Sequence, residues 1–304
     1  MIMTMDIGGT KTLCTFWEDG RPAERQRIPT ASIDDLGRLI SQLACGRTVE
    51  CLCIAAAGPV HRQTVELTGT GLRIDRDSLK NALPQIPTII LMNDLAAVGY
   101  ALPAIATGQL LSLKEGSPQK GAKAVLSLGT GLGVCVITPV GEVLPSEGGH
   151  MDFAPGDLRQ QQICDTLHKQ YGRLSCERLL SGQGLVNIYG ALTGAWGLSP
   201  AQITDKAFKQ EPDAMETMTV FSQILGSACG NFGLIFMASG GIYLSGGILP
   251  KIHPLLDQNA FLNAFLDKGR VRDLLEEIPI RLILDETAPS LGAALYAARL
   301  SATV

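Results

Sequence analysis

The sequence predicts an α/β protein with two domains. Its 304 residues exceed the usual size of a single hydrophobic core, and chains of this length commonly divide into two domains. Short β-branched apolar runs, typical of buried strands, alternate in both halves with segments that have the apolar spacing of helices. This alternation is typical of α/β layers.

The composition excludes several classes of function. Hydrophobic residues make up 46% and charged residues 18% of the chain, which fits a globular protein with a sizeable core. The net charge of −4 gives no electrostatic reason to expect a nucleic acid or an acidic membrane as a partner. We find neither an apolar run of about 18 residues, as a membrane span needs, nor a signal-peptide pattern after Met1. We therefore expect a cytoplasmic protein.

The N-terminal part of the chain is predicted to form the first α/β layer. The turn signal Glu18-Asp19-Gly20 predicts that residues 1–28 form a hairpin followed by a third strand. The further elements expected here are a helix over 33–43, a strand over 51–58, a β segment over 64–72, a helix over 75–83 and a strand over 89–92.

A second set of elements begins near Gln109. Two β runs, 123–128 and 134–138, flank a glycine-rich turn, and helical patterns dominate from 158 to 238. A strand over 241–245, a helix over 251–256, helical segments over 261–265 and 271–278, a strand over 281–284 and a final helix over 291–300 complete the expectation. The two halves share the theme of a strand followed by a glycine turn, which hints at an internal duplication.

The eight cysteines do not form a disulfide framework in a chain of this length. Cys164 and His168 are four residues apart on a predicted helix, a spacing that can hold a metal, but no second pair of ligands has a zinc-like spacing, so we favour ordinary helical roles. Five cysteines lie in apolar surroundings and are expected in the core: Cys14, Cys51, Cys53, Cys135 and Cys229.

The apolar strand expected at 89–92 ends at Asn93-Asp94, and a helical pattern follows. A carboxylate at such a corner can project from a rigid backbone and act as a general base, which must approach a substrate proton to about 2.6–3.2 Å. The alternative is that Asp94 caps the helix, since Asp accepts hydrogen bonds from first-turn amides. Taken alone, the cap is the more common role.

Two further turns carry glycines suited to binding anions. In Asp6-Ile7-Gly8-Gly9-Thr10-Lys11, Gly8 and Gly9 permit backbone amides to approach an anion, and Thr10 adds a hydroxyl. Asp6 is suited to hold Mg²⁺ through water, because hard cations prefer oxygen ligands. The alternative is a plain hairpin turn. Ser245-Gly246-Gly247-Ile248 follows a strand and lets an adenosine lie close to the backbone.

The glycines Gly129, Gly131 and Gly133 do not form a dinucleotide site. Their spacing departs from G-x-G-x-x-G, and the residues after them are β-forming, whereas a Rossmann turn opens a helix. The P-loop pattern is absent as well. We expect a hairpin turn, with Thr130 at its tip, that is competent to bind an anion.

A polar stretch from Ser146 to Pro155 has no apolar periodicity. Glu147 and His150 within it have side chains that can hydrogen-bond vicinal hydroxyl groups, although a solvated loop is the alternative. Glu177 begins a further helical stretch, where an acidic residue also suits the helix dipole. Together, the glycine turns and the carboxylate corner indicate an enzyme that handles a nucleoside triphosphate.

With these residues assembled, the chain resembles the bacterial glucokinase family of the hexokinase and actin superfamily. The matching motifs follow the family order along nearly the whole chain. They are Asp6-Ile-Gly-Gly-Thr10, Met92-Asn-Asp-Leu-Ala-Ala-Val98, Gly129-Thr-Gly-Leu-Gly-Val134, Glu147-Gly-Gly-His-Met-Asp-Phe-Ala-Pro155, Glu177-Arg-Leu-Leu-Ser-Gly-Gln-Gly-Leu-Val-Asn-Ile-Tyr189, Ser245-Gly-Gly-Ile248 and Asp267-Lys-Gly-Arg270.

The resemblance implies two ribonuclease-H-like domains, 1–103 plus 288–304 and 104–287, with ATP and a sugar in the cleft between them. It implies a homodimer, Asp94 as the base for the sugar 6-hydroxyl, and Mg²⁺ near Asp6. The sugar ligands would be Asn93, Glu147, His150 and Glu177. The phosphates would contact Gly8, Gly9, Thr10, Gly129, Thr130 and Gly131, and the adenosine Gly246 and Gly247.

One departure from the family bears on the substrate. A Thr-Asn-x-x-Trp element near the sugar is replaced by Thr68-Gly69-Thr70-Gly71-Leu72, which predicts a smaller and less polar wall. From the motifs that match the family, we expect an ATP-dependent kinase of glucose. A kinase of another hexose or an amino sugar, or a non-catalytic sugar or nucleotide sensor, stays open as an alternative. The zinc cysteines of the related ROK sugar kinases are absent after His150.

Overall fold

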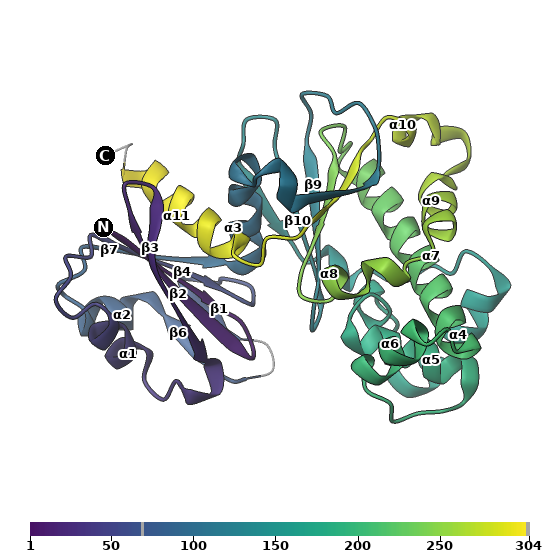
Figure 1. Cartoon of the computed structure of the whole chain (residues 1–304), viewed down its shortest axis with the longest axis horizontal. Coiled ribbons are helices and arrows are strands. Elements are labelled where there is room, and N and C mark those ends of the chain that lie inside the picture. Colours follow the sequence, from purple (N-terminus) through teal and green to yellow (C-terminus); the bar gives the residue numbers. More distant parts are fainter. Residues whose placement is uncertain (68–69, 302–304) are drawn as a thin grey trace. The chain divides into compact units, whose positions relative to one another are not determined.

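The computed structural model describes residues 1–67 and 70–301, which fall into two compact units. Unit 1 comprises residues Met1–Ile105 together with the C-terminal segment from Thr287, and unit 2 comprises Ala106–Glu286. Each unit contains its own mixed sheet, in agreement with the predicted α/β class (Figure 1).

Unit 1 is built on a five-stranded sheet whose strand order is β3-β2-β1-β4-β7. The strands β1, β4 and β7 are parallel, and β2 and β3 continue the sheet in antiparallel pairing. The bounds are β1 Ile2–Ile7, β2 Lys11–Glu18, β3 Arg21–Pro29, β4 Cys51–Ala56 and β7 Thr88–Asn93, with a separate pair β5 Thr64–Glu66 and β6 Arg73–Asp75.

Helices cover both faces of the first sheet (Figure 1). Met3 and Met5 of β1 are buried in the core cluster that includes residues of α1 and α2. Thr4 points the other way, where its Oγ1 lies 2.8 Å from Oγ of Ser290 on α11. The sheet is thus fixed between two helical layers. The helices are α1 Leu36–Leu43, α2 Arg76–Ala82, α3 Asp94–Ala101 and α11 Ala288–Ser301.

Unit 2 repeats this strand pattern with one added strand. Its sheet has the order β11-β10-β9-β12-β13-β8, in which β9, β12 and β13 are parallel and the others antiparallel to their neighbours. The bounds are β8 Leu110–Lys114, β9 Lys123–Leu128, β10 Leu132–Ile137, β11 Val143–Ser146, β12 Ile242–Ser245 and β13 Ile280–Ile283.

Helices dominate the middle of unit 2, as the sequence predicts. They are α4 Leu158–Tyr171, α5 Gly182–Thr193, α6 Pro200–Phe208, α7 Pro212–Ile235, α8 Leu249–Ile252, α9 Gln258–Leu266 and α10 Asp273–Glu276. Single 3-10 turns occur at Thr30–Ser32, Leu102–Ala104, Thr107–Gln109, Gly148–His150, Cys176–Arg178, His253–Leu255 and Gly269–Val271.

The long helix α7 forms the centre of the second core. Cβ atoms placed at Gly226 and Gly230 would lie 2.0 Å and 2.5 Å from the carbonyl oxygens of Phe261 and Phe265, so glycine allows α9 to pack against it at close range. Within the described residues, α7 is the one helix long and apolar enough to span a membrane, and most of its apolar window is buried inside the protein.

Several element boundaries differ from the prediction for local reasons. The first helix begins at Leu36, because the side chain of Asp35 caps it by accepting a hydrogen bond from the Arg38 amide. The β segment expected over 64–72 is limited to Thr64–Glu66 before residue 68. The helix expected over 251–256 is divided between α8 and a 3-10 turn.

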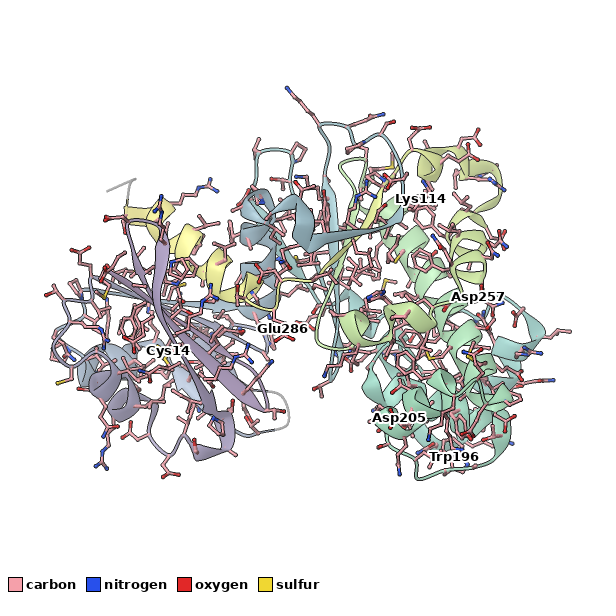
Figure 2. The ribbon with its side chains drawn as sticks, in the orientation of Figure 1. Cys14, Lys114, Trp196, Asp205, Asp257 and Glu286 are labelled. Atoms are coloured by element: carbon pink, nitrogen blue, oxygen red, sulfur yellow. The ribbon has the colours of Figure 1, made fainter. Side chains whose placement is uncertain are left out.

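The cysteines all have free thiols, and most are buried. Burial raises the pKa of Cys14 to about 12, and Glu24 contributes to this shift. The thiols of Cys51 and Cys176 have pKa values raised to about 11 by burial. They therefore stay protonated and act as small core residues. In unit 2, Lys114 of β8 (labelled in Figure 2) donates a hydrogen bond of 3.1 Å to the Ile278 carbonyl, in the segment that precedes β13.

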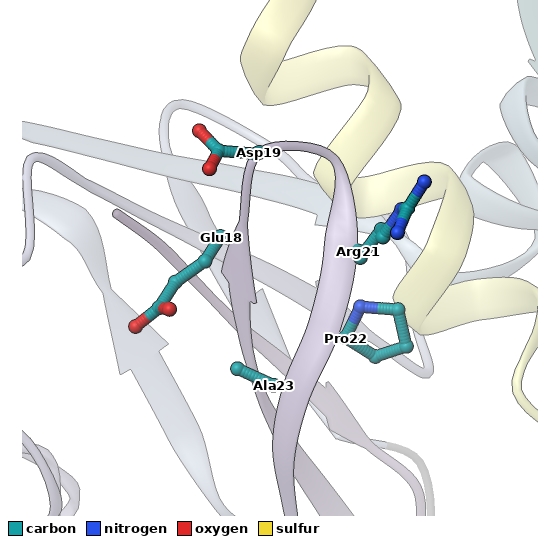
Figure 3. Close-up of a pocket in the computed structure, with 5 residues that line it drawn as sticks. All are labelled: Glu18, Asp19, Arg21, Pro22 and Ala23. Atoms are coloured by element: carbon teal, nitrogen blue, oxygen red, sulfur yellow. The ribbon is translucent and has the colours of Figure 1, made fainter.

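The β2–β3 hairpin turns at Asp19 and Gly20, both of which have positive φ. This geometry matches the right-handed twist of the flanking strands and confirms the predicted turn. A shallow hollow of about 380 Å³ lies beside it and contains none of the candidate site residues (Figure 3). Its lining consists of Glu18, Asp19, Arg21, Pro22 and Ala23.

Candidate functional site

The carboxyl ends of the three parallel strands of unit 1 meet at one edge of the sheet. Ile7 pairs with Ala56, and Ala56 pairs with Asn93, so the strand ends of β1, β4 and β7 lie in register. In open α/β sheets ligands bind outside the carboxyl ends of strands. Asp6 and Asp94 are both located at this edge.

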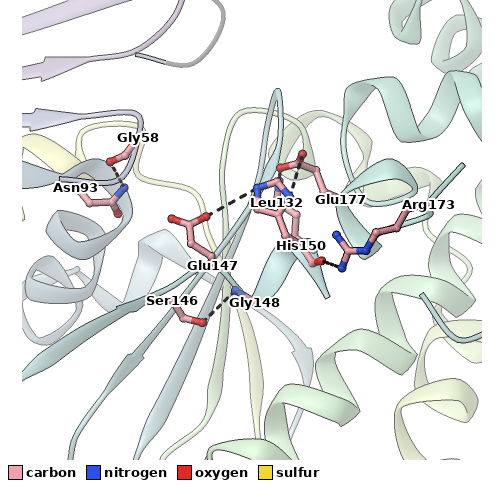
Figure 4. Close-up of polar contacts among 9 residues, drawn as sticks. All are labelled: Gly58, Asn93, Leu132, Ser146, Glu147, Gly148, His150, Arg173 and Glu177. Carbon is pink, nitrogen blue, oxygen red and sulfur yellow. Dashed lines mark hydrogen bonds and ion pairs between the residues drawn. The ribbon is translucent and has the colours of Figure 1, made fainter. Parts of the chain in front are cut away.

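Asn93, rather than Asp94, caps helix α3. Its Oδ1 accepts hydrogen bonds from the amides of Leu95 and Ala96 at 3.0 Å and 3.1 Å. Its Nδ2 donates to the carbonyl of Gly58 at 3.0 Å, which ties the end of β7 to the end of β4 (Figure 4). The reading of Asp94 as the cap is therefore wrong: Asp94 is the first residue of the helix.

Asp6 and Asp94 have strongly raised pKa values. Burial raises the pKa of Asp6 to about 7, the negative charge of Asp94 adds to the shift, and Lys11 opposes it. Burial raises the pKa of Asp94 to about 6, against the lowering effect of the hydrogen bond from the Leu95 amide. Two partly buried carboxyl groups within electrostatic reach are typical of functional sites.

The glycine turn between β1 and β2 is a hairpin turn stabilised by hydrogen bonds. The Gly8 amide donates to the Lys11 carbonyl at 3.1 Å, and Thr30 Oγ1 donates to the Gly8 carbonyl at 2.7 Å. Gly9 and Thr10 are exposed at its tip. The hairpin expected as the alternative is thus present, and its exposed tip stays compatible with an anion.

The turn between β9 and β10 is a glycine hairpin as predicted. The Gly129 amide donates to the Gly131 carbonyl at 2.9 Å, and the Gly182 amide donates to the Gly129 carbonyl at 3.0 Å. Thr130 is exposed. Because a strand follows the turn, the dinucleotide motif is excluded in this position.

The third glycine turn follows β12. Gly246 has a φ of +99°, and a Cβ there would lie 2.2 Å from the Leu128 carbonyl oxygen, so only glycine fits without distortion. Gly247 is exposed, and a Cβ there would meet no atom within 4 Å. The turn therefore presents open backbone next to the end of β9.

Glu147, His150 and Glu177 are brought together in unit 2. His150 Nε2 lies 3.8 Å from Glu147 Oε2, and its Nδ1 lies 3.8 Å from Glu177 Oε1 (Figure 4). The side chains of Glu147 and His150 are more than half exposed, whereas that of Glu177 is 30% exposed. The stretch contains a 3-10 turn, and two of these three polar side chains remain largely solvated.

The His150 turn packs directly on the strand that follows the glycine hairpin. A Cβ at Gly149 would lie 1.8 Å from the Leu132 carbonyl oxygen. Arg173 donates to the His150 carbonyl at 2.8 Å and to Asp152 Oδ1 at 2.6 Å. The main chain of the His150 turn is thus held by contacts from two neighbouring segments.

Two residues that sequence reasoning missed hold the Glu177 segment. Ser181 Oγ donates to the Glu177 carbonyl at 2.8 Å, and Asn187 Nδ2 donates to the Arg178 carbonyl at 2.8 Å. Asn187 is fully buried, and its Oδ1 accepts from the Tyr171 hydroxyl. A buried Asn on an apolar helix, within the motif that begins at Glu177, was the available signal. Glu177 lies in a 3-10 turn before α5 rather than in an α-helix.

Cys164 and His168 form no metal site in this structure. His168 Nδ1 lies 3.0 Å from the carbonyl oxygen of Cys164, a contact within the helix. Over residues 1–67 and 70–301, no three His, Cys, Asp or Glu side chains are grouped as ligands for a metal ion.

Comparison with known proteins identifies the class. The glucokinase family model matches residues 3–300. The glucokinase of Trichormus variabilis is 35% identical over 99% of both chains, and that of Yersinia enterocolitica is 33% identical over 96% of this chain and 94% of its own. The crystal structure of a glucokinase from an Antarctic psychrotroph superposes with a TM-score of 0.86, at 28% identity and 98% coverage of both chains.

The fold is therefore that of the sugar phosphotransferases with two α/β units, and a ROK hexokinase from Thermus thermophilus shares it at a TM-score of 0.73 and 20% identity. Within this class the chain belongs to the glucokinase family, whose members phosphorylate glucose with ATP.

Proposed function

We propose that Asp94 is the general base that accepts the proton of the glucose 6-hydroxyl during phosphoryl transfer from ATP. This assignment rests on the geometry of the β7–α3 corner. Asn93 caps the helix there, and Asp94 is the next residue. A pKa of about 6 leaves the carboxylate ionised at neutral pH while it is still basic enough to accept a proton.

The sugar hydroxyl ligands in this proposal are Glu147, His150, Glu177 and Asn93. The carboxylates accept hydrogen bonds from hydroxyl groups, and the imidazole can either donate or accept. Asn93 uses one of its two amide hydrogens for Gly58 and keeps the second for a ligand. The contacts of His150 with both glutamates support a preformed set of polar groups.

The nucleotide would bind at the three glycine turns: Gly8, Gly9 and Thr10, then Gly129, Thr130 and Gly131 for the phosphates, and Gly246 and Gly247 for adenosine. Their exposed backbone and the closely packed Gly246 fit such a ligand. A bound Mg²⁺ would neutralise charge on the phosphates. Asp6 fits as its water-mediated ligand, because a partly buried carboxyl group beside Asp94 gains from a nearby cation.

The proposal also covers the domain organisation, the cellular location and the oligomeric state. Units 1 and 2 would be the two domains of the kinase, the protein would be cytoplasmic, and two copies would form a homodimer. Support comes from the family relationship and from the burial of α7 in the core. Sedimentation equilibrium of the purified chain tests the dimer, and a monomer at micromolar concentration contradicts it.

The chain departs from its family pattern at residues 68–72, and this departure bears on the choice of hexose. Thr68 and Gly69 lie outside the described residues, while Leu72 is partly buried against the core of unit 1. An apolar side chain at this position fits either glucose or another hexose or amino sugar. A non-catalytic sensor is disfavoured, since the two carboxyl groups and the polar cluster are all present.

The test is a coupled ADP-release assay with Mg-ATP and a panel of glucose, mannose, fructose, galactose, N-acetylglucosamine and N-acetylmannosamine. Turnover with glucose that exceeds turnover with every other sugar supports the proposal. Turnover with another sugar alone moves the substrate and points to Leu72. No turnover with any sugar, together with retained ligand binding, supports the sensor.

A further inference from the structure

The carboxylate of Glu177 accepts a hydrogen bond from the glycine turn between β9 and β10. Its Oε2 accepts a hydrogen bond of 3.0 Å from the amide of Leu132, the residue that follows Gly131 (Figure 4). A Cβ at Gly131 would lie 2.3 Å from that same oxygen. The carboxylate therefore takes the space that any side chain at Gly131 would need.

The other oxygen of this carboxylate faces the polar cluster. Oε1 of Glu177 lies 3.8 Å from His150 Nδ1. The backbone on either side is fixed, because the carbonyls of Glu177 and Arg178 accept hydrogen bonds from Ser181 and Asn187. With its main chain held in this way, the side chain has one oxygen on the glycine turn and one oxygen among the polar groups.

We propose that Glu177 couples sugar binding to nucleotide binding by joining the sugar ligands to the turn that receives the phosphates. This inference rests on the proposed function, and adds to it a thermodynamic link through one side chain. A sugar hydroxyl that donates to Oε1 immobilises the carboxylate, and the immobilised Oε2 orders the Leu132 amide. The nucleotide then binds a turn that is already ordered, so its binding loses less conformational entropy.

The coupling must be reciprocal, since it is a free energy shared by the two binding equilibria. Glucose therefore tightens the binding of the nucleotide, and the nucleotide tightens the binding of glucose by the same factor. Couplings between sites in proteins commonly amount to about 5-fold to 150-fold, and we expect at least the lower value here.

The experiment uses isothermal titration calorimetry with glucose and with the Mg complex of AMPPNP, each in the presence and absence of the other. In the wild type, each ligand should tighten the other at least about fivefold. In Gly131→Ala, the added methyl displaces the carboxylate, so glucose should bind at least about tenfold more weakly even without nucleotide. A substitution in the phosphate turn would thus change affinity for the sugar.

Gly182→Ala is the matched control. A Cβ at Gly182 would lie 3.9 Å from the Gly129 carbonyl oxygen, in ordinary contact with the same turn, and away from Glu177. Glucose affinity without nucleotide should stay within about twofold of wild type. Glu177→Asp is the second variant. Its shorter side chain cannot hold both partners, so the coupling factor should fall toward one while thermal unfolding shows a folded protein.

Three results overturn the inference: no mutual tightening of the two ligands in the wild type, wild-type glucose affinity in folded Gly131→Ala without nucleotide, or a wild-type coupling factor in Glu177→Asp. Glucose turnover, measured in parallel, separates this failure from failure of the proposed function. Normal turnover together with any of these results removes only the coupling. Absence of wild-type turnover with glucose removes the proposed function itself.

Discussion

Asn93 and Asp94 divide two tasks at the β7–α3 corner. Asn93 Oδ1 accepts hydrogen bonds from the amides of Leu95 and Ala96, and its Nδ2 holds the Gly58 carbonyl. Asp94 occupies the first position of the helix. A helix N-terminus stabilises a carboxylate, so this placement supports an ionised Asp94 despite its burial.

Removal of the cap should reduce stability and activity together. In Asn93→Ala the Ala96 amide loses its acceptor, and the Leu95 amide keeps only the Asp94 carboxylate. We expect a loss of about 1–2 kcal/mol in the free energy of unfolding, together with a lower kcat. Urea denaturation and steady-state assays measure the two effects. Asp35→Ala is the matched control, because it removes the cap of α1 and should reduce stability with kcat unchanged. Equal kcat in the Asn93→Ala and wild-type proteins contradicts this prediction.

Asp6 should reduce the stability of the ligand-free protein above pH 4. Its pKa rises from 3.8 in the unfolded chain to about 7 in the folded protein, so the folded state binds more protons between these values. Stability therefore falls as pH rises across this window. Asp6→Asn should raise the free energy of unfolding at pH 8 by about 1–4 kcal/mol, at about 1.4 kcal/mol per pKa unit, with no difference near pH 3. A stabilisation that is equal at both pH values would contradict this origin.

The raised pKa of Asp94 should govern the acid limb of the pH–rate profile. The base acts only when it is ionised, and burial raises its pKa to about 6. We expect kcat/KM for glucose to fall about tenfold for each pH unit below about 6, and to level off above this value. A profile measured from pH 5 to pH 8 checks the expectation. A flat profile over this range would show that a different group, or none, accepts the proton.

Asn187 should act on the sugar through Glu177. In Asn187→Leu the Arg178 carbonyl loses its donor, so the Glu177 segment loosens and KM for glucose should rise about tenfold, with a small change in KM for ATP. The buried network should also lose about 1–3 kcal/mol of stability.

Ser222→Ala is the control for this prediction. Ser222 is fully buried and accepts a hydrogen bond of 3.0 Å from the Asp257 amide, in a part of unit 2 that holds no sugar ligand. It should lose comparable stability with an unchanged KM for glucose. If both variants raise that KM equally, the role of Asn187 is only structural.

Local signals made much of the fold predictable. The turn at Asp19 and Gly20 and the strand ending at Asn93 depend on neighbouring residues, and both are confirmed. The strand Val143–Ser146 was missed because Pro145 and an exposed Leu144 weaken the β pattern. Such residues are tolerated here because β11 is an edge strand, a fact that only the sheet order reveals.

The candidate site was harder to predict where long-range contacts decide it. The motifs selected Glu147, His150 and Glu177, and the structure places them together. The bond between Glu177 and the Leu132 amide joins residues 45 positions apart, which no local pattern encodes. The helix cap could not be assigned from local sequence either, because Asn and Asp cap helices about equally well. The contact with Gly58 that favours Asn93 involves a residue that is distant in the sequence.

The most direct test of the central claim is the turnover of Asp94→Asn with glucose and Mg-ATP, compared with the wild type at pH 8. The substitution keeps the size of the side chain and removes its basicity. We expect kcat to fall by about 10²–10⁴-fold, with the affinity for the Mg complex of AMPPNP unchanged. A kcat within about threefold of wild type, well below what a general base contributes, would contradict the assignment of Asp94 as the base.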